Sequence, residues 1–183
     1  MLNSDIEYGT SDLQRPDYYT QSLPYNVVCS NILPYFNQSV KDSLCTIDAK
    51  VDGFYHVGSV VDSVISSSQI HIPSITELGY GYGNMFDASY NLQCCIEEGS
   101  AYPIFDRGTT SNNNPLCVRY SSTNVSKAYW TRSSVSDRYG SYATGDRFGE
   151  YYIDIDGSYN FTKDFALNPL SANVVAIIRF GKK

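Results

Sequence analysis

A thiol beside an imidazole makes a strong nucleophile, so cysteine and histidine are the first residues to consider for catalysis. The two histidines, His56 and His71, each lie in a short apolar, strand-like context. The cysteines form no C-x-x-C motif and no zinc-like spacing: Cys29, Cys45, Cys94, Cys95 and Cys117. Because the start of the chain is acidic and polar rather than an export signal, we predict reduced, mostly buried thiols with no catalytic role, and we leave one disulfide open.

Among the carboxylates, Glu77 stands in a local pattern that a helix start would use. Ser74-Ile75-Thr76-Glu77 matches a capping box, in which the serine hydroxyl accepts from the third helical amide and the glutamate accepts from the serine amide. We therefore predict a strand over residues 69–73 and a short helix from Ser74 that ends at the glycines from Gly79 onward. Glu77 is then a structural residue rather than a catalytic acid.

A second acidic segment could bind a hard cation. Asp154, Asp156 and Asn160 present oxygen atoms at alternate positions, but the glycine is fourth rather than sixth and no glutamate is twelfth. A hairpin turn at Asp156-Gly157 explains the same residues. We predict no metal site and no cofactor.

Motifs that would define an enzyme are absent from the sequence. It has no G-x-S-x-G, no phosphate-binding P-loop and no H-E-x-x-H. We therefore name no catalytic residues and predict that the protein is not an enzyme.

Composition narrows the classes of partner. The chain has 183 residues with 13 Lys and Arg against 19 Asp and Glu, a formal charge of −6, and no basic cluster. That charge argues against nucleic-acid binding, and no apolar run approaches the roughly 18 residues that membrane insertion requires.

Tyrosine dominates the aromatic residues, with 17 against eight phenylalanines and one tryptophan. Tyrosine mixed with serine, asparagine and glycine is typical of recognition surfaces. The mixture is densest between about residues 106 and 160, where we predict these ligand-binding residues: Tyr120, Arg138, Tyr139, Tyr142, Tyr151 and Tyr159.

The elements that would position these residues follow from periodicity and turn signals. Residues 1–24 lack periodicity and are predicted to be an extended attachment arm, followed by one domain over residues 25–183. Apolar positions from Val27 to Ile47 recur at helical spacing, and Pro34 should split that helix in two. Strands are predicted over residues 116–120 and 128–134, in a hairpin at 150–155 and 159–162, and in a central, doubly buried strand at 173–180. Helices followed by short antiparallel strands indicate an α+β fold.

Several blocks of this sequence resemble an uncharacterised domain family of bacteria and their phages. They are Ile70-His-Ile-Pro-Ser-Ile-Thr-Glu-Leu-Gly79 and Tyr129-Trp-Thr-Arg-Ser133, over residues 25–181. The family resembles the C-type-lectin-like folds of formylglycine-generating-enzyme and phage tropism-determinant domains. The resemblance implies a small twisted antiparallel sheet with two N-terminal helices and long loops. Trp130 would then fill the core, and Arg132 would brace carbonyls or a carboxylate such as Glu77. The chain departs from the family at Ala176-Ile177-Ile178-Arg179, where a G-V-R-P-like motif is expected.

These observations predict a non-enzymatic bacteriophage virion protein, made in the host cytoplasm, such as a fibre, tail-tip or capsid-decorating component. It would bind a host-surface glycan or protein through its tyrosine-rich loops and would assemble with other virion proteins and with copies of itself. A purely structural cement or assembly protein and a bacterial surface adhesin domain are the alternatives.

Overall fold

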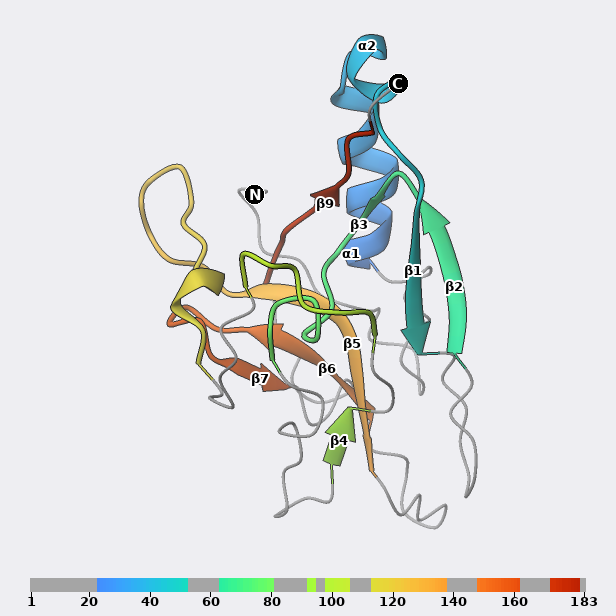
Figure 1. Ribbon diagram of the computed structural model, residues 1–183. Helices are drawn as coiled ribbons and strands as arrows, with labels where there is room; N and C mark the ends of the chain where they lie inside the picture. The colour runs from blue at the N-terminus through green and yellow to red at the C-terminus, as the bar shows by residue number, and fades with distance from the viewer. Residues whose placement is uncertain are drawn as a thin grey trace.

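The described part of the chain mixes a few short helices with several small sheets. Figure 1 shows the computed structural model, which describes residues 23–52, 63–80, 92–94, 98–105, 113–137, 148–161 and 172–181. Within these ranges, all strand pairs are antiparallel except one short parallel pair. The fold class is therefore α+β in this part of the chain. Residues 1–22 of the predicted attachment arm lie outside the described residues.

The N-terminal helix is broken in two, as predicted, although the break falls after Tyr35. One helical stretch comprises α1 (Leu23–Asn26), the π-helix η2 (Val27–Ile32) and the 3-10 helix η3 (Leu33–Tyr35), and Pro34 stands in its last turn. Phe36 is extended, and Asn37 caps the second piece, α2 (Gln38–Lys41), by accepting from the amide of Val40 at 3.0 Å.

The predicted helix does not continue to Ile47. The amide of Cys45 donates to the carbonyl of Arg179 at 2.8 Å, and Leu44 forms a β-bridge with Phe180. Strand β1 (Ile47–Asp52) then pairs with β2 (Ser63–Ser68). Backbone pairing with residues 179 and 180 therefore replaced the helix that the apolar spacing predicted here.

The largest sheet has the order β4 (Leu92–Cys94), β5 (Tyr129–Asp137), β6 (Phe148–Ile153), β7 (Tyr159–Phe161), as Figure 1 shows. Its β5 and its β6–β7 hairpin confirm the predicted strands. Neighbouring residues of β5 point to opposite faces. Tyr129 therefore joins one core cluster while Trp130 joins the other, and both are almost fully buried. The prediction that Trp130 fills the core is confirmed.

The segment 173–180 is not the central, doubly buried strand that we predicted. It forms two short pieces, β8 (Asn173–Val174), parallel to β5, and β9 (Ile177–Ile178), antiparallel to β3 (Ile70–His71). Both isoleucines of β9 are only partly buried. The apolar run serves two different sheets in turn, so its hydrophobicity did not indicate one continuous strand.

The prediction of a strand over residues 116–120 is also wrong. Pro115 opens a 3-10 turn, η5 (Pro115–Cys117), because a proline suits the first position of a helical turn and Asn114 accepts from the amide of Leu116 at 3.2 Å. Only Tyr120 bridges to a strand-like partner, Ser126.

Candidate functional site

Two regions gather polar side chains from distant parts of the sequence. The first surrounds the turn after β3. Ser74 Oγ accepts from the Glu77 amide at 3.1 Å, and Glu77 Oε2 accepts from the Ser74 amide at 3.0 Å, which confirms the capping box. The predicted helix is only one turn long. The amides of Gly79 and Tyr80 donate to the carbonyls of Thr76 and Ile75, and Gly79 has a φ of +84°, which closes the turn as a Schellman motif.

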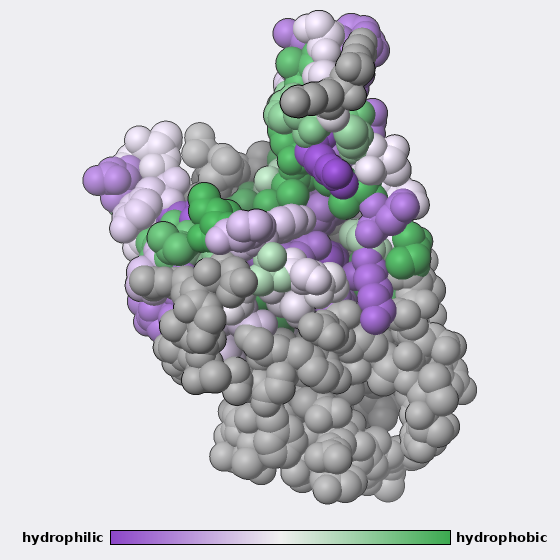
Figure 2. All heavy atoms as spheres, viewed as in Figure 1, coloured by the Kyte–Doolittle hydropathy of each residue, from purple (hydrophilic) through white to green (hydrophobic). Residues whose placement is uncertain are grey.

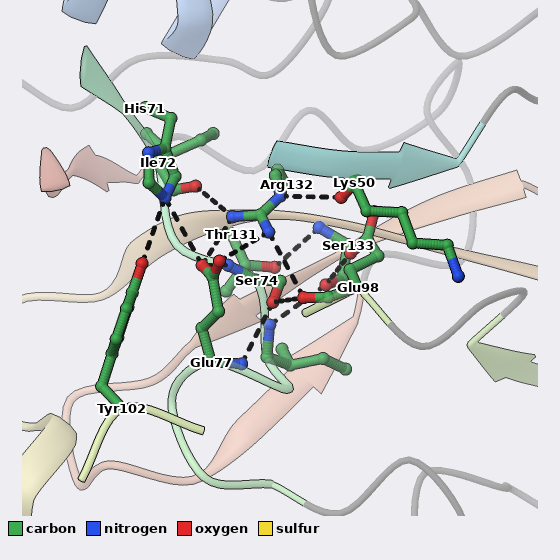
Figure 3. A network of polar contacts seen from close by, with 11 residues as sticks. Lys50, His71, Ile72, Ser74, Glu77, Glu98, Tyr102, Thr131, Arg132 and Ser133 are labelled. Carbon is green, nitrogen blue, oxygen red and sulfur yellow. Dashed lines mark hydrogen bonds and ion pairs between the residues drawn. The ribbon is translucent and has the colours of Figure 1, made fainter. Parts of the chain in front are cut away.

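Arg132 on β5 holds this turn against three other segments (Figure 3). Its Nη1 donates to Glu77 Oε2 at 2.6 Å and its Nη2 to Glu77 Oε1 at 2.9 Å, a bidentate pair. The remaining donors reach the backbone carbonyls of Ile72 at 2.9 Å, Glu98 at 3.3 Å and Lys50 at 3.3 Å. A guanidinium has five N–H groups, and these five bonds use them all. The prediction that Arg132 braces carbonyls and Glu77 is confirmed on both counts.

Residues next to the ion pair extend the network. Ser133 Oγ donates to the Glu98 carboxylate and accepts from the Ile75 amide at 3.0 Å. Ser74 Oγ donates to the Glu98 carbonyl at 2.6 Å. The residues of this group, which we call the Arg132 network, are Ser74, Glu77, Glu98, Arg132 and Ser133, and all are buried.

The charge state of the Arg132 network follows from its contacts. Burial alone would raise the pKa of Glu77, but His71, with Nε2 3.6 Å from Glu77 Oε2, and Arg132 outweigh it and lower the pKa from its ordinary 4.5 to about 2. The hydroxyl of Tyr102 lies 3.4 Å from the same His71 nitrogen, and burial raises the pKa of Tyr102 to about 12. An ionised carboxylate fixed by a cation and closed off from solvent is suited to bracing loops, and not to exchanging protons with a substrate.

The second region is organised by Asn114. Its side-chain Nδ2 donates to the carbonyls of Leu78 and Phe105, both at 3.1 Å. Its backbone amide donates to the carbonyl of Gly157 at 2.8 Å. Together with the bond to Leu116, these contacts tie three loops together: residues 102–105, residues 113–119 and the β6–β7 turn. Sequence reasoning missed Asn114. The Asn-Pro pair that it forms with Pro115 is a turn-initiation signal that could have pointed to it.

The β6–β7 turn confirms the predicted hairpin but not its predicted length. The Gly157 amide donates to the Asp154 carbonyl at 3.0 Å, and only Gly157 of the turn has positive φ, +80°. This is a type I turn followed by a left-handed glycine. A Cβ at Gly157 would lie 2.5 Å from the carbonyl oxygen of Asn114, so the close approach of the two loops requires glycine.

From the Asn114 loops, residues 120–126 project as a separate loop, which we call the recognition loop (Figure 1). The bridge between Tyr120 and Ser126 closes its base, and the Ser121 amide donates to the Val125 carbonyl at 2.8 Å. Asn124 turns the chain with a φ of +59°. Tyr120 is 57% exposed, and the loop shows a hydrophilic surface in Figure 2.

The structure separates the predicted ligand-binding residues. Tyr120 is exposed on the recognition loop, whereas Tyr151 is 1% exposed and stacks edge-to-face on the partly buried Tyr159 with ring centroids 5.9 Å apart. Tyr151 is therefore out of reach of a surface ligand, because β6 points it inward with Tyr129. Three other predicted residues lie outside the described residues: Arg138, Tyr139 and Tyr142.

At the foot of the recognition loop lies a group that we call the apolar base: Ile104, Leu116, Ile155, Arg119 and Asp156. Its aliphatic members are 70%, 45% and 53% exposed in that order. The Arg119 guanidinium lies 5.3 Å from the centre of the Phe105 ring, and its Nη1 donates to the carbonyls of Leu116 and Val118. Hydrophobic surface gathers over η5 and the neighbouring 98–105 segment in Figure 2.

Within the described residues, no three His, Cys, Asp or Glu side chains are arranged to hold a metal ion. Asp154 and Asp156 instead accept from the amides of Ile155 and Ser158 in the turn. The thiol of Cys117 is free and buried, and burial raises its pKa. No helix in the described ranges has the length and apolar character to span a membrane.

Comparison with known proteins adds no relative. No protein-family model, no curated protein and no solved structure matches this chain.

Proposed function

We propose that the chain is a non-enzymatic recognition protein of a bacteriophage virion surface, such as a fibre, tail-tip or capsid-decorating component. It binds a host-surface glycan or protein through the recognition loop. The observation that carries the binding site is Tyr120, an aromatic ring 57% exposed on a loop whose base is closed by a β-bridge and whose other side chains are mostly polar. The virion setting is supported by the resemblance of the P-S-x-x-E and W-x-R-S blocks to the phage and bacterial family.

The chemistry of the recognition loop suits weak, specific contacts. Tyr120 offers a flat ring for stacking, and Ser121, Thr123 and Asn124 offer hydroxyl and amide groups that can hydrogen-bond to sugar hydroxyls or to peptide groups. Several copies on one particle multiply a weak single-site affinity. The attachment arm, residues 1–24, holds each copy on the particle in this proposal.

An enzymatic function is not part of the proposal. Glu77 and His71 are buried in and around the Arg132 network, and Glu77 is bound by Arg132. The network's geometry favours bracing of the loops that carry the exposed surface.

The test is binding of the purified chain to a glycan array and to host cells. We expect Tyr120→Ala to weaken binding about tenfold or more, as for a central aromatic contact. Tyr35→Ala is the matched control, because Tyr35 is 87% exposed but lies on η3, away from the recognition loop. Tyr139→Ala and Tyr142→Ala extend the test to the rest of the predicted site. Equal binding by wild type, Tyr120→Ala and Tyr35→Ala would refute the recognition loop as the site.

A structural cement or assembly protein is the second candidate function, favoured by the exposed aliphatic side chains of the apolar base. In that case the chain binds no host surface and co-assembles with virion proteins instead. A bacterial surface adhesin domain is the third candidate, and binding to a non-host surface would favour it.

A further inference from the structure

We propose that the apolar base is the contact between two copies of this chain, in which Arg119 of each copy faces Asp156 of the other. The proposal is independent of host binding, because the apolar base and the recognition loop use different side chains. It places a self-association surface beside the recognition loop, at the same end of the molecule.

The first argument is the exposed aliphatic area. Ile104, Leu116 and Ile155 come from three separate loops, yet Asn114 holds these loops together through Phe105, Leu116 and Gly157. A single exposed aliphatic residue needs no explanation, whereas a group contributed by several fixed loops is typical of an interaction site.

The second argument is charge complementarity. The apolar base carries a cation on the loop after η5 and an anion on the β6–β7 turn. Within one chain these two groups form no ion pair, since the ion pairs found among the described residues belong to Glu77. A twofold rotation about the apolar residues would place each Arg119 against the Asp156 of the other copy. A partner of one charge sign would satisfy only one of these groups, so a second copy fits best.

Both charged groups are held ready for such a contact. Arg119 uses Nη1 for the carbonyls of Leu116 and Val118, which leaves Nη2 and Nε for a carboxylate. Asp156 Oδ1 accepts from the amide and hydroxyl of Ser158, which lowers the pKa of Asp156 and leaves Oδ2 for a guanidinium. The net charge of −6 repels copies in general, so local opposite-charge pairs are needed to align them.

The experiment is sedimentation equilibrium of the full chain over a wide concentration range. We expect a concentration-dependent wild-type dimer, and at least tenfold weaker association for Arg119→Asp, for Asp156→Arg and for Leu116→Asp. An equimolar mixture of Arg119→Asp and Asp156→Arg should regain the dimer, because each copy then offers the charge that the other needs at both contacts. A mixture of Leu116→Asp with wild type should show no more dimer than the wild type forms at its own concentration, because an added carboxylate on the apolar surface has no complement in the other copy.

The matched control is Phe180→Asp, which alters a side chain 59% exposed near α2, and it should leave the dimer intact. A wild type that stays monomeric at all concentrations overturns the proposal, as does folded Arg119→Asp that fails to recover in the mixture. If Arg119→Asp does not fold by circular dichroism, Ile104→Asp and Ile155→Asp replace it, and unchanged dimerisation of both overturns the proposal. Tyr120→Ala should dimerise normally, so loss of host binding and loss of self-association are distinguishable.

Discussion

The Arg132 network and the Asn114 loops both hold distant segments of the chain together, but with different chemistry. In each, one side chain hydrogen-bonds to backbone groups that are far apart in the sequence. Arg132 does so with a charge, is 2% exposed, and needs the carboxylate of Glu77 as a counter-ion. Asn114 does so with a neutral amide, is 3% exposed, and supports loops whose outer side chains face solvent. A charged side chain with its counter-ion suits the closed interior, while a neutral amide can lie just beneath exposed loops without altering the charge of their surface.

The largest effect should come from breaking the charged brace. We expect Arg132→Met to lower the free energy of unfolding by about 3–5 kcal/mol, because Glu77 is left as a buried charge without its cation. Urea denaturation measures the change. Arg119→Met is the control, since this arginine lies over Phe105 near the surface, and it should cost no more than about 1 kcal/mol. Equal losses in both variants would contradict the distinction between the two regions.

Acid should weaken the stabilisation that the Glu77–Arg132 pair provides and should not affect the hydrogen bonds of the Asn114 side chain. The folded pKa of Glu77 is about 2 against an ordinary 4.5, so its stabilising contribution is complete above pH 4.5 and is lost as the pH falls toward 2. We expect this residue to account for about 3 kcal/mol of acid destabilisation. The measurement is the free energy of unfolding from pH 7 to 2 in wild type and Glu77→Gln. The same acid dependence in both proteins would show that Glu77 does not contribute it.

Breaking the neutral brace should cost less. Asn114→Leu removes the side-chain hydrogen bonds to the carbonyls of Leu78 and Phe105 and to the amide of Leu116, and we expect a loss of about 2–3 kcal/mol. The neighbouring Asn113 is half-buried and its side chain donates to the carbonyl of Asp156, so Asn113→Leu should cost about 1 kcal/mol at most. Thermal unfolding of the two variants side by side tests this, and a larger loss for Asn113→Leu would refute the role of Asn114.

The smallest effect on stability should come from the exposed loop that the Asn114 region supports. We expect Tyr120→Ala to change the free energy of unfolding by less than about 0.5 kcal/mol, as for a surface position away from special backbone geometry. Chemical denaturation of the variant provides the measurement. A loss above about 1 kcal/mol would show that the ring is a packing residue rather than a presented one.

Much of what could be predicted from sequence concerns contacts within five residues. Ser74 and Glu77 are three residues apart, and their reciprocal bonds formed as the spacing indicated even though the helix ended after one turn. The alternation of Tyr129 and Trp130 across β5 was equally visible. The strand at 116–120 was wrong because Pro115 and its cap outweighed an apolar pattern, and the strand at 173–180 was wrong because two sheets divide it.

The sequence by itself determined the mixed α and β character, the capping box and the glycine turn, because each depends on local geometry or on a short periodic pattern. The tertiary structure alone decided that Arg132 would meet Glu98 as well as Glu77, that Asn114 would join three loops, and that Tyr151 would face inward while Tyr120 faces out. Those outcomes depend on which backbone carbonyls are brought together across intervals of tens of residues, and a linear pattern of residue types does not encode that pairing.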